Sequence, residues 1–143
     1  MARVVVVDTG PLVALLRENE QRHLWAVETF HSTSGVVTTC EAVLTEACFL
    51  LGGNTPGSDA LLEQVEAGRL TVVPLGAETR AVRGLMKKYR DVPMSYADAC
   101  LVRLTELHTD CVLITLDSDF DVYRRNGRQV IPQVAPHRGP RRR

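Results

Sequence analysis

The sequence predicts an α/β fold, a three-layer α/β/α sandwich around a central, mostly parallel sheet. A run of four valines, residues 4–7, is apolar on both faces, which is typical of an interior strand covered by helices on both sides. Helical periodicity alternates with short β-branched runs along the chain, as in right-handed βαβ units. No internal repeat or linker divides the sequence, so we expect one domain over residues 1–134.

Each element follows from local signals, taken in chain order. The predicted strands cover residues 4–7, 36–39, 70–75, 111–116 and, as a short edge strand, 130–131. The predicted helices cover residues 12–17, 22–31, 41–51, 56–67, 77–89 and 96–107. We interpret Gly10-Pro11 as a turn that keeps the end of the first strand open, and Pro93 as a break before the last helix.

The composition is that of an ordinary globular protein, with 45% hydrophobic and 24% charged residues. No apolar run approaches the ~20 residues that cross a bilayer, and the N-terminus lacks a signal-peptide pattern. We therefore expect a cytoplasmic protein without membrane association. The four cysteines form no CxxC pair, and three lie in apolar segments, so buried reduced thiols are expected: Cys40, Cys48, Cys100 and Cys111.

The formal net charge of zero conceals an asymmetry along the chain. Residues 124–143 contain seven arginines and no acid, which leaves 10 basic residues against 17 acidic ones in residues 1–123. The Pro/Arg-rich tail, residues 135–143, is predicted to be disordered. It either contributes phosphate contacts to a nucleic acid or is a solvated end without a role.

Four acids occupy positions that a doubly wound sheet can bring together. Asp8 and Asp117 follow apolar strands at their carboxyl ends, where open α/β sheets form their ligand crevice. Glu46 stands on a helix that is apolar almost all round, so it either faces solvent or turns toward a polar site with a cation or metal. Asp98 lies in a helical first turn and forms a capping box with Ser95. Helix capping is the alternative role for each aspartate.

Taken together, the four carboxylates favour a metal site. Crowded carboxylates raise one another's pKa unless a cation compensates, and no Lys or Arg has an evident place beside them. An all-oxygen set suits Mg²⁺ or Mn²⁺, whereas zinc would require His or Cys. An EF-hand over Asp117, Asp119 and Asp121 is excluded, because Val122 and Arg128 stand where that loop needs Gly and Glu. Mg²⁺ held by acids alone is typical of phosphate-ester hydrolysis by a metal-activated water.

The order of these motifs resembles that of PIN-domain proteins, and among them the VapC-type toxins of bacterial toxin–antitoxin pairs. The resemblance covers residues 3 to about 132 and is carried by VVVVDTGPLVALL, VLTEACFLL, SYADACLVRL and VLITLDSDF. It implies an Mg²⁺- or Mn²⁺-dependent endoribonuclease whose metal-binding acids are Asp8, Glu46, Asp98 and Asp117. Asp119 matches an additional position that varies among such proteins.

The resemblance also has implications for neighbouring residues and for partners. Thr9 and Thr115 lie beside the acids at positions suited to orient a carboxylate or a water. Family members of this type are homodimers, neutralised by a cognate antitoxin protein whose peptide segment lies over the active-site region. The substrate implied is RNA, and the arginine-rich end lies outside the family pattern.

Other classes of protein stay open. A non-catalytic PIN-like module that binds RNA or protein would keep the acids only as structure. A phosphatase of the haloacid-dehalogenase type also places Asp at a strand end, but it expects Asp-x-Asp, and Asp8-Thr9-Gly10 lacks the second acid. A phospho-acceptor receiver domain expects an acceptor Asp after a middle strand, and residues 72–75 offer none. The sequence therefore favours metal-dependent hydrolysis of RNA.

Overall fold

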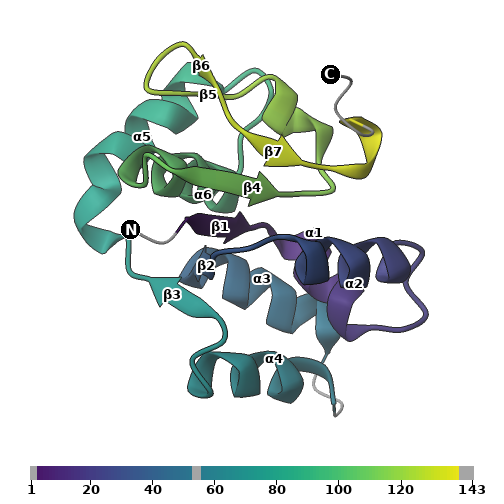
Figure 1. The fold of residues 1–143 in the computed structure, drawn as a ribbon. Helices are drawn as coiled ribbons and strands as arrows, with labels where there is room; N and C mark the ends of the chain where they lie inside the picture. The colour runs from purple at the N-terminus through teal and green to yellow at the C-terminus, as the bar shows by residue number, and fades with distance from the viewer. Residues whose placement is uncertain (1–2, 53–55, 139–143) are drawn as a thin grey trace.

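A five-stranded parallel sheet with strand order β3-β2-β1-β4-β7 forms the centre of the molecule (Figure 1). The computed structural model describes residues 3–52 and 56–138. The strands of this sheet are β1 (Val4–Val7), β2 (Val36–Cys40), β3 (Thr71–Val73), β4 (Cys111–Ile114) and β7 (Gln133–Val134). Every neighbouring pair in the sheet is parallel, as the apolar runs predict.

Helices cover both faces of the sheet, which confirms the predicted three-layer α/β/α architecture. The α-helices are α1 (Thr9–Leu16), α2 (His23–Ser32), α3 (Glu41–Leu51), α4 (Gly57–Glu66), α5 (Thr79–Lys88) and α6 (Tyr96–Leu107). Three 3₁₀ helices are η1 (Gly76–Glu78), η2 (Ser118–Asp121) and η3 (Pro136–Arg138). Helix α6 contacts β1, β2 and β4, and α5 packs alongside it. On the other face, Leu12 of α1 and Phe30 of α2 share an apolar pocket with Val37 of β2.

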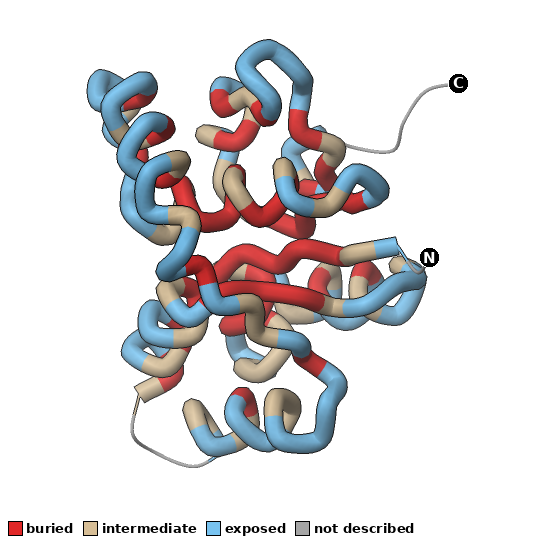
Figure 2. Tube along the Cα trace, turned by 90° about the vertical axis from the view of Figure 1, so that its left-hand side faces the viewer, coloured by how far each residue is buried: buried red, intermediate tan, exposed pale blue. Residues whose placement is uncertain are grey.

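Strand β1 runs through the middle of the hydrophobic core. Val5, Val6 and Val7 are each 0% exposed, and Figure 2 shows buried segments running through the centre of the molecule. Fully burying a side chain of this size contributes about 1.5–3 kcal/mol relative to leaving it exposed. The run of valines is therefore the interior strand that its composition predicts, and it holds the residue that follows it in a fixed position.

The interpretation of Gly10-Pro11 as a turn is wrong, because both residues lie inside the first turn of α1, which begins at Thr9. Proline is well tolerated in a helical first turn, where its missing N–H needs no partner. Gly10 leaves room for its neighbour, since a Cβ there would lie 3.1 Å from Cδ1 of Leu116. The strand therefore passes directly into the helix through Asp8.

The predicted edge strand at residues 130–131 is also wrong, since the edge of the sheet is β7. A separate antiparallel hairpin, β5 (Arg124–Arg125) with β6 (Gln129–Val130), precedes it. Its turn has left-handed backbone at Asn126 (φ 51°) and Gly127 (φ 84°), conformations that Asn and Gly tolerate best. Strands of two residues are too short to show an alternating pattern, so periodicity could not locate them.

The part of the Arg-rich tail that lies within the described residues forms η3. Residues 139–143, which include the last three arginines of the predicted tail, lie outside the described residues. All four cysteines are free, as predicted; three are buried and Cys48 is partly exposed. In the described part of the chain, no helix combines the length and the apolar character that crossing a membrane requires.

Candidate metal centre

The register between β1 and β4 brings the first two acids to one edge of the sheet. Val7 pairs with Ile114, and the N–H of Asp8 donates to the carbonyl oxygen of Ile114 across 3.0 Å. Asp8 is thus one residue beyond its strand, and Asp117 is three residues beyond the end of the neighbouring strand. Both lie at the carboxyl edge, where the sequence predicts them.

Asp8 is buried, with 8% of its surface exposed, and each of its carboxylate oxygens accepts a hydrogen bond. Oδ1 accepts the N–H of Thr9 (2.7 Å) and Oδ2 accepts the hydroxyl of Thr115 (2.8 Å). Asp8 is therefore the N-cap of α1, and the capping role does not remove it from the crevice. Burial, helped by the charges of Asp98 and Asp117, raises its pKa to about 6 against the two hydrogen bonds, which lower it.

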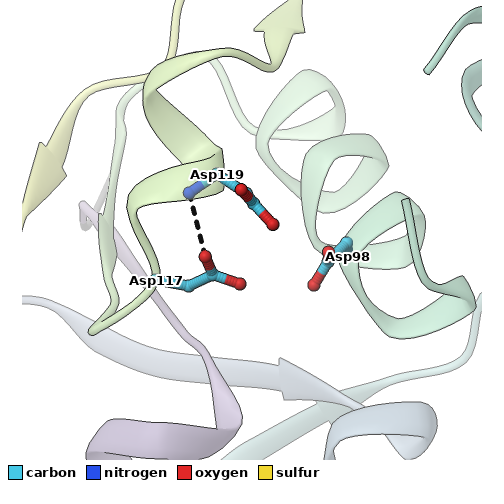
Figure 3. A group of neighbouring side chains, drawn as sticks. All are labelled: Asp98, Asp117 and Asp119. Carbon is cyan, nitrogen blue, oxygen red and sulfur yellow. Dashed lines mark hydrogen bonds between the residues drawn. The ribbon is translucent and has the colours of Figure 1, made fainter. Parts of the chain in front are cut away.

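A chain of hydrogen bonds continues from Asp8 to the start of η2. The hydroxyl oxygen of Thr115 accepts the N–H of Asp117 (2.9 Å), and Oδ1 of Asp117 accepts the N–H of Asp119 (2.9 Å) (Figure 3). Asp117 is therefore the N-cap of η2, as one reading of the sequence proposed. These bonds fix the backbone that carries two more acids beside Asp8.

Asp98 enters the crevice from the first turn of α6. Its N–H donates to Oγ of Ser95 (3.0 Å), which confirms Ser95 as the helix N-cap. Ser95 also donates to the Asp98 carboxylate, as a capping box predicts, and Oδ2 of Asp98 accepts the hydroxyl of Tyr123 across 2.9 Å. Burial raises the pKa of Asp98, the Tyr123 hydrogen bond lowers it, and the charge of Asp117 raises it further, leaving it above its usual value.

Asp98, Asp117 and Asp119 form a cluster of neighbouring acids (Figure 3). One carboxylate oxygen from each lies within 4.8 Å of the others, close enough for one ion to contact all of them. Asp119 therefore belongs to the cluster itself, whereas the family resemblance implied only an additional, variable position for this residue. Burial and the charge of Asp117 raise the pKa of Asp119.

Glu46 reaches the same crevice from α3, although its side chain is exposed. Its Oε2 accepts the hydroxyl of Thr9 across 3.2 Å. Glu46 therefore both faces solvent and turns toward a polar site, the two roles that the sequence left open, because it lies in an open polar pocket. This pocket has a volume of about 560 Å³, and the acids that line it are Asp8, Glu46, Asp98 and Asp117.

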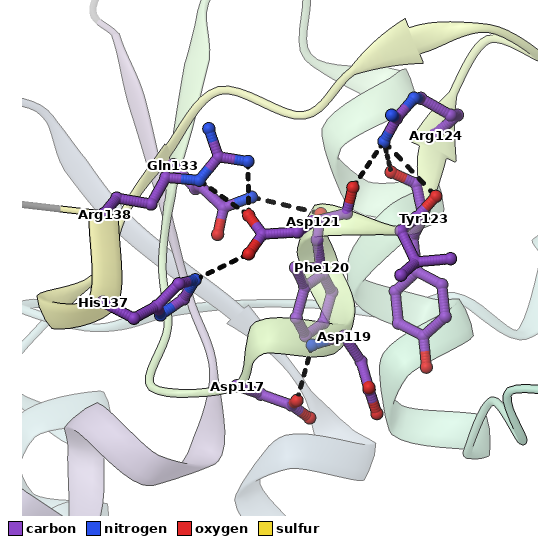
Figure 4. Close-up of polar contacts among 10 residues, drawn as sticks. Asp117, Asp119, Phe120, Asp121, Tyr123, Arg124, Gln133, His137 and Arg138 are labelled. Atoms are coloured by element: carbon purple, nitrogen blue, oxygen red, sulfur yellow. Dashed lines mark hydrogen bonds and ion pairs between the residues drawn. The ribbon is translucent and has the colours of Figure 1, made fainter. Parts of the chain in front are cut away.

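The donor set fits a hard divalent cation. Five acids make up this set: Asp8, Glu46, Asp98, Asp117 and Asp119. Within residues 3–52 and 56–138, no Lys, Arg or His forms an ion pair with any of them. By contrast, the adjacent Asp121 pairs with His137 and Arg138 (Figure 4). Carboxylates crowded without a cation, three of them with raised pKa values, are what Mg²⁺ or Mn²⁺ would neutralise.

The sequence did not reveal that Tyr123 forms a hydrogen bond with Asp98. Tyr123 lies 25 residues from Asp98, and an aromatic residue beside Phe120 reads as ordinary core. Only the tertiary packing shows that its hydroxyl meets a carboxylate. Thr115 was indicated by resemblance, without the bond to Asp8 that the structure shows.

A parallel α/β/α domain whose acids converge at the carboxyl edge of its sheet belongs to a class of protein whose site suits a hard divalent cation. Residues 5–126 match the family model named PIN domain, so this chain belongs to the PIN-domain family. A comparison with curated protein sequences found no match.

Solved structures of bacterial proteins share this fold. VapC20 of Mycobacterium tuberculosis, described as a toxin that cleaves the sarcin–ricin loop, superimposes with a TM-score of 0.76 at 21% identity, over 82% of this chain and 93% of that chain. VapBC2 of Rickettsia felis, bound to a promoter DNA fragment, gives 0.64 at 12% identity, over 92% and 98%. FitAcB of Neisseria gonorrhoeae gives 0.53 at 20% identity, over 80% and 88%.

Proposed function

We propose that this protein is an Mg²⁺- or Mn²⁺-dependent endoribonuclease. The observation that carries the proposal is the cluster of Asp98, Asp117 and Asp119, with one oxygen from each within 4.8 Å of the others. Asp8 and Glu46 line the adjoining pocket. Membership of the PIN-domain family, whose members are nucleases, supports hydrolysis of a phosphodiester.

The carboxylates of Asp98, Asp117 and Asp119 would hold the ion, with Asp8 and Glu46 beside it. Bound there, a divalent cation supplies an activated water and neutralises charge that develops on the phosphate. Thr115 and Thr9 keep the carboxylates of Asp8 and Glu46 in place. Because five acids would repel an RNA phosphate, we expect RNA to bind in this crevice only when the cation is present.

We further propose that the protein is the toxin of a toxin–antitoxin pair. VapC20 is described as a toxin that cleaves the sarcin–ricin loop, and VapBC2 is solved bound to a DNA fragment from its promoter. By analogy, the substrate of this chain is single-stranded or loop RNA, and its partners are a cognate antitoxin and a second copy of the chain. Action on cellular RNA requires a cytoplasmic location.

The test of nuclease activity is cleavage of total RNA by purified protein with Mg²⁺ or Mn²⁺, and with EDTA. We expect cleavage that EDTA abolishes and Mn²⁺ restores, and that Asp98→Asn lowers at least 100-fold. The matched control is Asp59→Asn, which removes the same charge from an exposed position on α4. Metal-dependent cleavage that survives both Asp98→Asn and Asp117→Asn would overturn the site. Tight RNA binding without cleavage would favour a non-catalytic module.

Expression in a bacterial host separates a toxin from a housekeeping nuclease. We expect growth arrest with the wild-type chain and with Asp59→Asn, and normal growth with Asp98→Asn at equal protein level. Normal growth with a wild-type chain that cleaves RNA in vitro would retain the nuclease and reject the toxin.

A further inference from the structure

We infer that Tyr123 is a positioning residue, which orients the Asp98 carboxylate toward the metal through the hydrogen bond from its phenol hydroxyl. This inference rests on the proposed function, since it assigns a role toward the ion that the acids would hold. The phenol hydroxyl donates to one carboxylate oxygen of Asp98, Oδ2, across 2.9 Å. The Asp98 carboxylate also receives hydrogen bonds from Ser95, at the start of the same helix, so Tyr123 is its partner from outside that helix.

The direction of the hydrogen bond follows from chemistry. An ionised carboxylate has no proton to donate, so the phenol must be the donor and Asp98 the acceptor. Tyr123 is 0% exposed, and the Asp98 carboxylate is the partner that satisfies its hydroxyl. Leaving a buried hydroxyl unpaired is unfavourable, so the two side chains hold each other in one orientation.

Tyr123 also connects Asp98 to the other half of the cluster. Its backbone N–H donates to the carbonyl oxygen of Asp119 across 3.2 Å, while its side chain bonds Asp98. One residue therefore contacts acids from α6 and from η2, which are distant in sequence. The separation between these two acids is set in part by the length of a tyrosine side chain.

The ring itself cannot move easily. It packs edge-on against Phe120 (centroids 5.2 Å apart, 88° between planes) and against Tyr89 (5.1 Å, 64°). Phe120 lies in η2 directly after Asp119, so the same packing braces the segment that carries the acids (Figure 4). A rigid ring that presents one hydroxyl to a metal-binding carboxylate is the outer-sphere arrangement that tunes many metal sites.

The test compares Tyr123→Phe with a matched variant, Tyr89→Phe. Each removes one hydroxyl from the same aromatic cluster, but the partner of the Tyr89 hydroxyl is the backbone N–H of Arg124 (2.9 Å) and not a carboxylate. Mn²⁺ binding is measured by the electron paramagnetic resonance of free Mn²⁺, on monodisperse protein that melts cooperatively without metal. We expect Tyr123→Phe to weaken Mn²⁺ binding about 10- to 100-fold, and Tyr89→Phe to leave it within about twofold.

RNA cleavage as a function of Mn²⁺ concentration provides a second measurement. If Tyr123 acts through Asp98, Tyr123→Phe raises the Mn²⁺ concentration for half-maximal activity, and saturating Mn²⁺ restores most of the rate. A packing defect would lower the rate at every Mn²⁺ concentration, and that result would overturn the inference. It would also be overturned by unchanged Mn²⁺ affinity in Tyr123→Phe, or by equal losses in the two variants.

The outcomes separate this inference from the proposed function. Wild-type protein that binds Mn²⁺, and loses it with Asp98→Asn, supports the metal centre whatever Tyr123→Phe does. Wild-type protein that binds no Mn²⁺ would overturn the metal centre, and the role of Tyr123 with it. A Tyr123→Phe chain that does not melt cooperatively would show that the hydroxyl serves folding, which also contradicts a role confined to positioning.

Discussion

The hydroxyl of Thr115 donates to Oδ2 of Asp8 across 2.8 Å and accepts the N–H of Asp117 across 2.9 Å. This side chain is 0% exposed and lies just beyond β4, so it joins the acids that follow two neighbouring strands. Because the hydroxyl has one proton and that proton goes to Asp8, the arrangement fixes both the donor direction and the geometry. The proposed metal centre therefore has a buried hydrogen-bond network behind two of its carboxylates.

Replacing Thr115 by Val tests this network, since Val keeps the volume and removes the hydroxyl. We expect Thr115→Val to lower the free energy of unfolding by about 1–3 kcal/mol and to weaken Mn²⁺ binding about tenfold or more. The matched control is Thr39→Val, because Thr39 is 0% exposed and its hydroxyl donates to the Val7 carbonyl oxygen (2.9 Å). Equal effects of both variants on Mn²⁺ affinity would show that the Thr115 bond has no special role.

Asp8 makes the stability of the metal-free protein depend on pH. Its pKa is raised from 3.8 to about 6, so between these values the folded chain binds more protons than the unfolded chain. The free energy of unfolding that Asp8 contributes therefore falls as pH rises through this window, by up to about 3 kcal/mol. We expect Asp8→Asn to be more stable than wild type at pH 7.5 in EDTA, and this difference to shrink at pH 4.

Urea unfolding of both proteins at the two pH values, in EDTA, measures this difference and cancels the contributions of other groups. We expect saturating Mg²⁺ to stabilise the wild-type chain more than Asp8→Asn, and so to narrow the difference between them. A wild-type chain that is more stable than Asp8→Asn at pH 7.5 without metal would contradict the burial of an uncompensated carboxylate.

Asp119 and Asp121 lie two residues apart in η2 and have different roles. Asp121 accepts a hydrogen bond from Nε of Arg138 (2.7 Å), and its other carboxylate oxygen lies 2.9 Å from Nε2 of His137. Burial alone would raise its pKa, but Arg138 and His137 lower it below its usual value. We expect Asp119→Asn to weaken Mn²⁺ binding about tenfold or more, and Asp121→Asn to leave Mn²⁺ affinity unchanged.

Hydrogen exchange provides the complementary result for Asp121→Asn. Faster exchange of the backbone amides of His137 and Arg138 is expected in Asp121→Asn and not in Asp119→Asn. The expected stability cost of Asp121→Asn is about 0–1 kcal/mol, because the ion pair is partly solvated. A loss of Mn²⁺ affinity in Asp121→Asn as large as in Asp119→Asn would contradict this separation of roles.

The arginines at residues 141–143 follow η3, which Asp121 holds beside the acids of η2. If these arginines contact RNA phosphates, replacing all three by Gln weakens binding to single-stranded RNA. The plot of log affinity against log salt then becomes less steep, and the magnitude of its negative slope falls by about 2. The control removes three exposed arginines elsewhere, in Arg80→Gln, Arg83→Gln and Arg128→Gln combined. Equal salt slopes for wild type and the tail variant would show that the tail has no part in binding.

The sequence predicted the core of the fold because its signals were long and consistent. The helices α3 and α6 have the predicted bounds, since apolar periodicity and end signals such as Ser95 and Gly52 agree. The sequence did not predict the short strands β5, β6 and β7, because two-residue strands form through tertiary pairing and leave no periodic pattern. The predicted turn at Gly10-Pro11 was wrong, because a dipeptide that breaks the interior of a helix is tolerated in its first turn.

Asp8, Asp98 and Asp117 were identifiable because each lies beside an element boundary that the sequence marks, whereas Glu46 lies within α3 and was identified by the apolar residues around it. Asp8 and Asp117 end apolar runs, and Asp98 begins a helix. The relative importance of Asp119 was not predictable, because it depends on how η2 turns after Asp117. The hydrogen bond from Tyr123 to Asp98 was not predictable either, since two residues 25 positions apart meet only through tertiary packing.

The central claim, that these acids form a divalent metal centre, is tested most directly by anomalous diffraction from crystals soaked in MnCl₂. The claim predicts a peak bonded to carboxylate oxygens of Asp98, Asp117 and Asp119, and its loss from crystals of Asp98→Asn. A peak bonded to other residues, or none at millimolar Mn²⁺ in crystals that leave the pocket open, would contradict it.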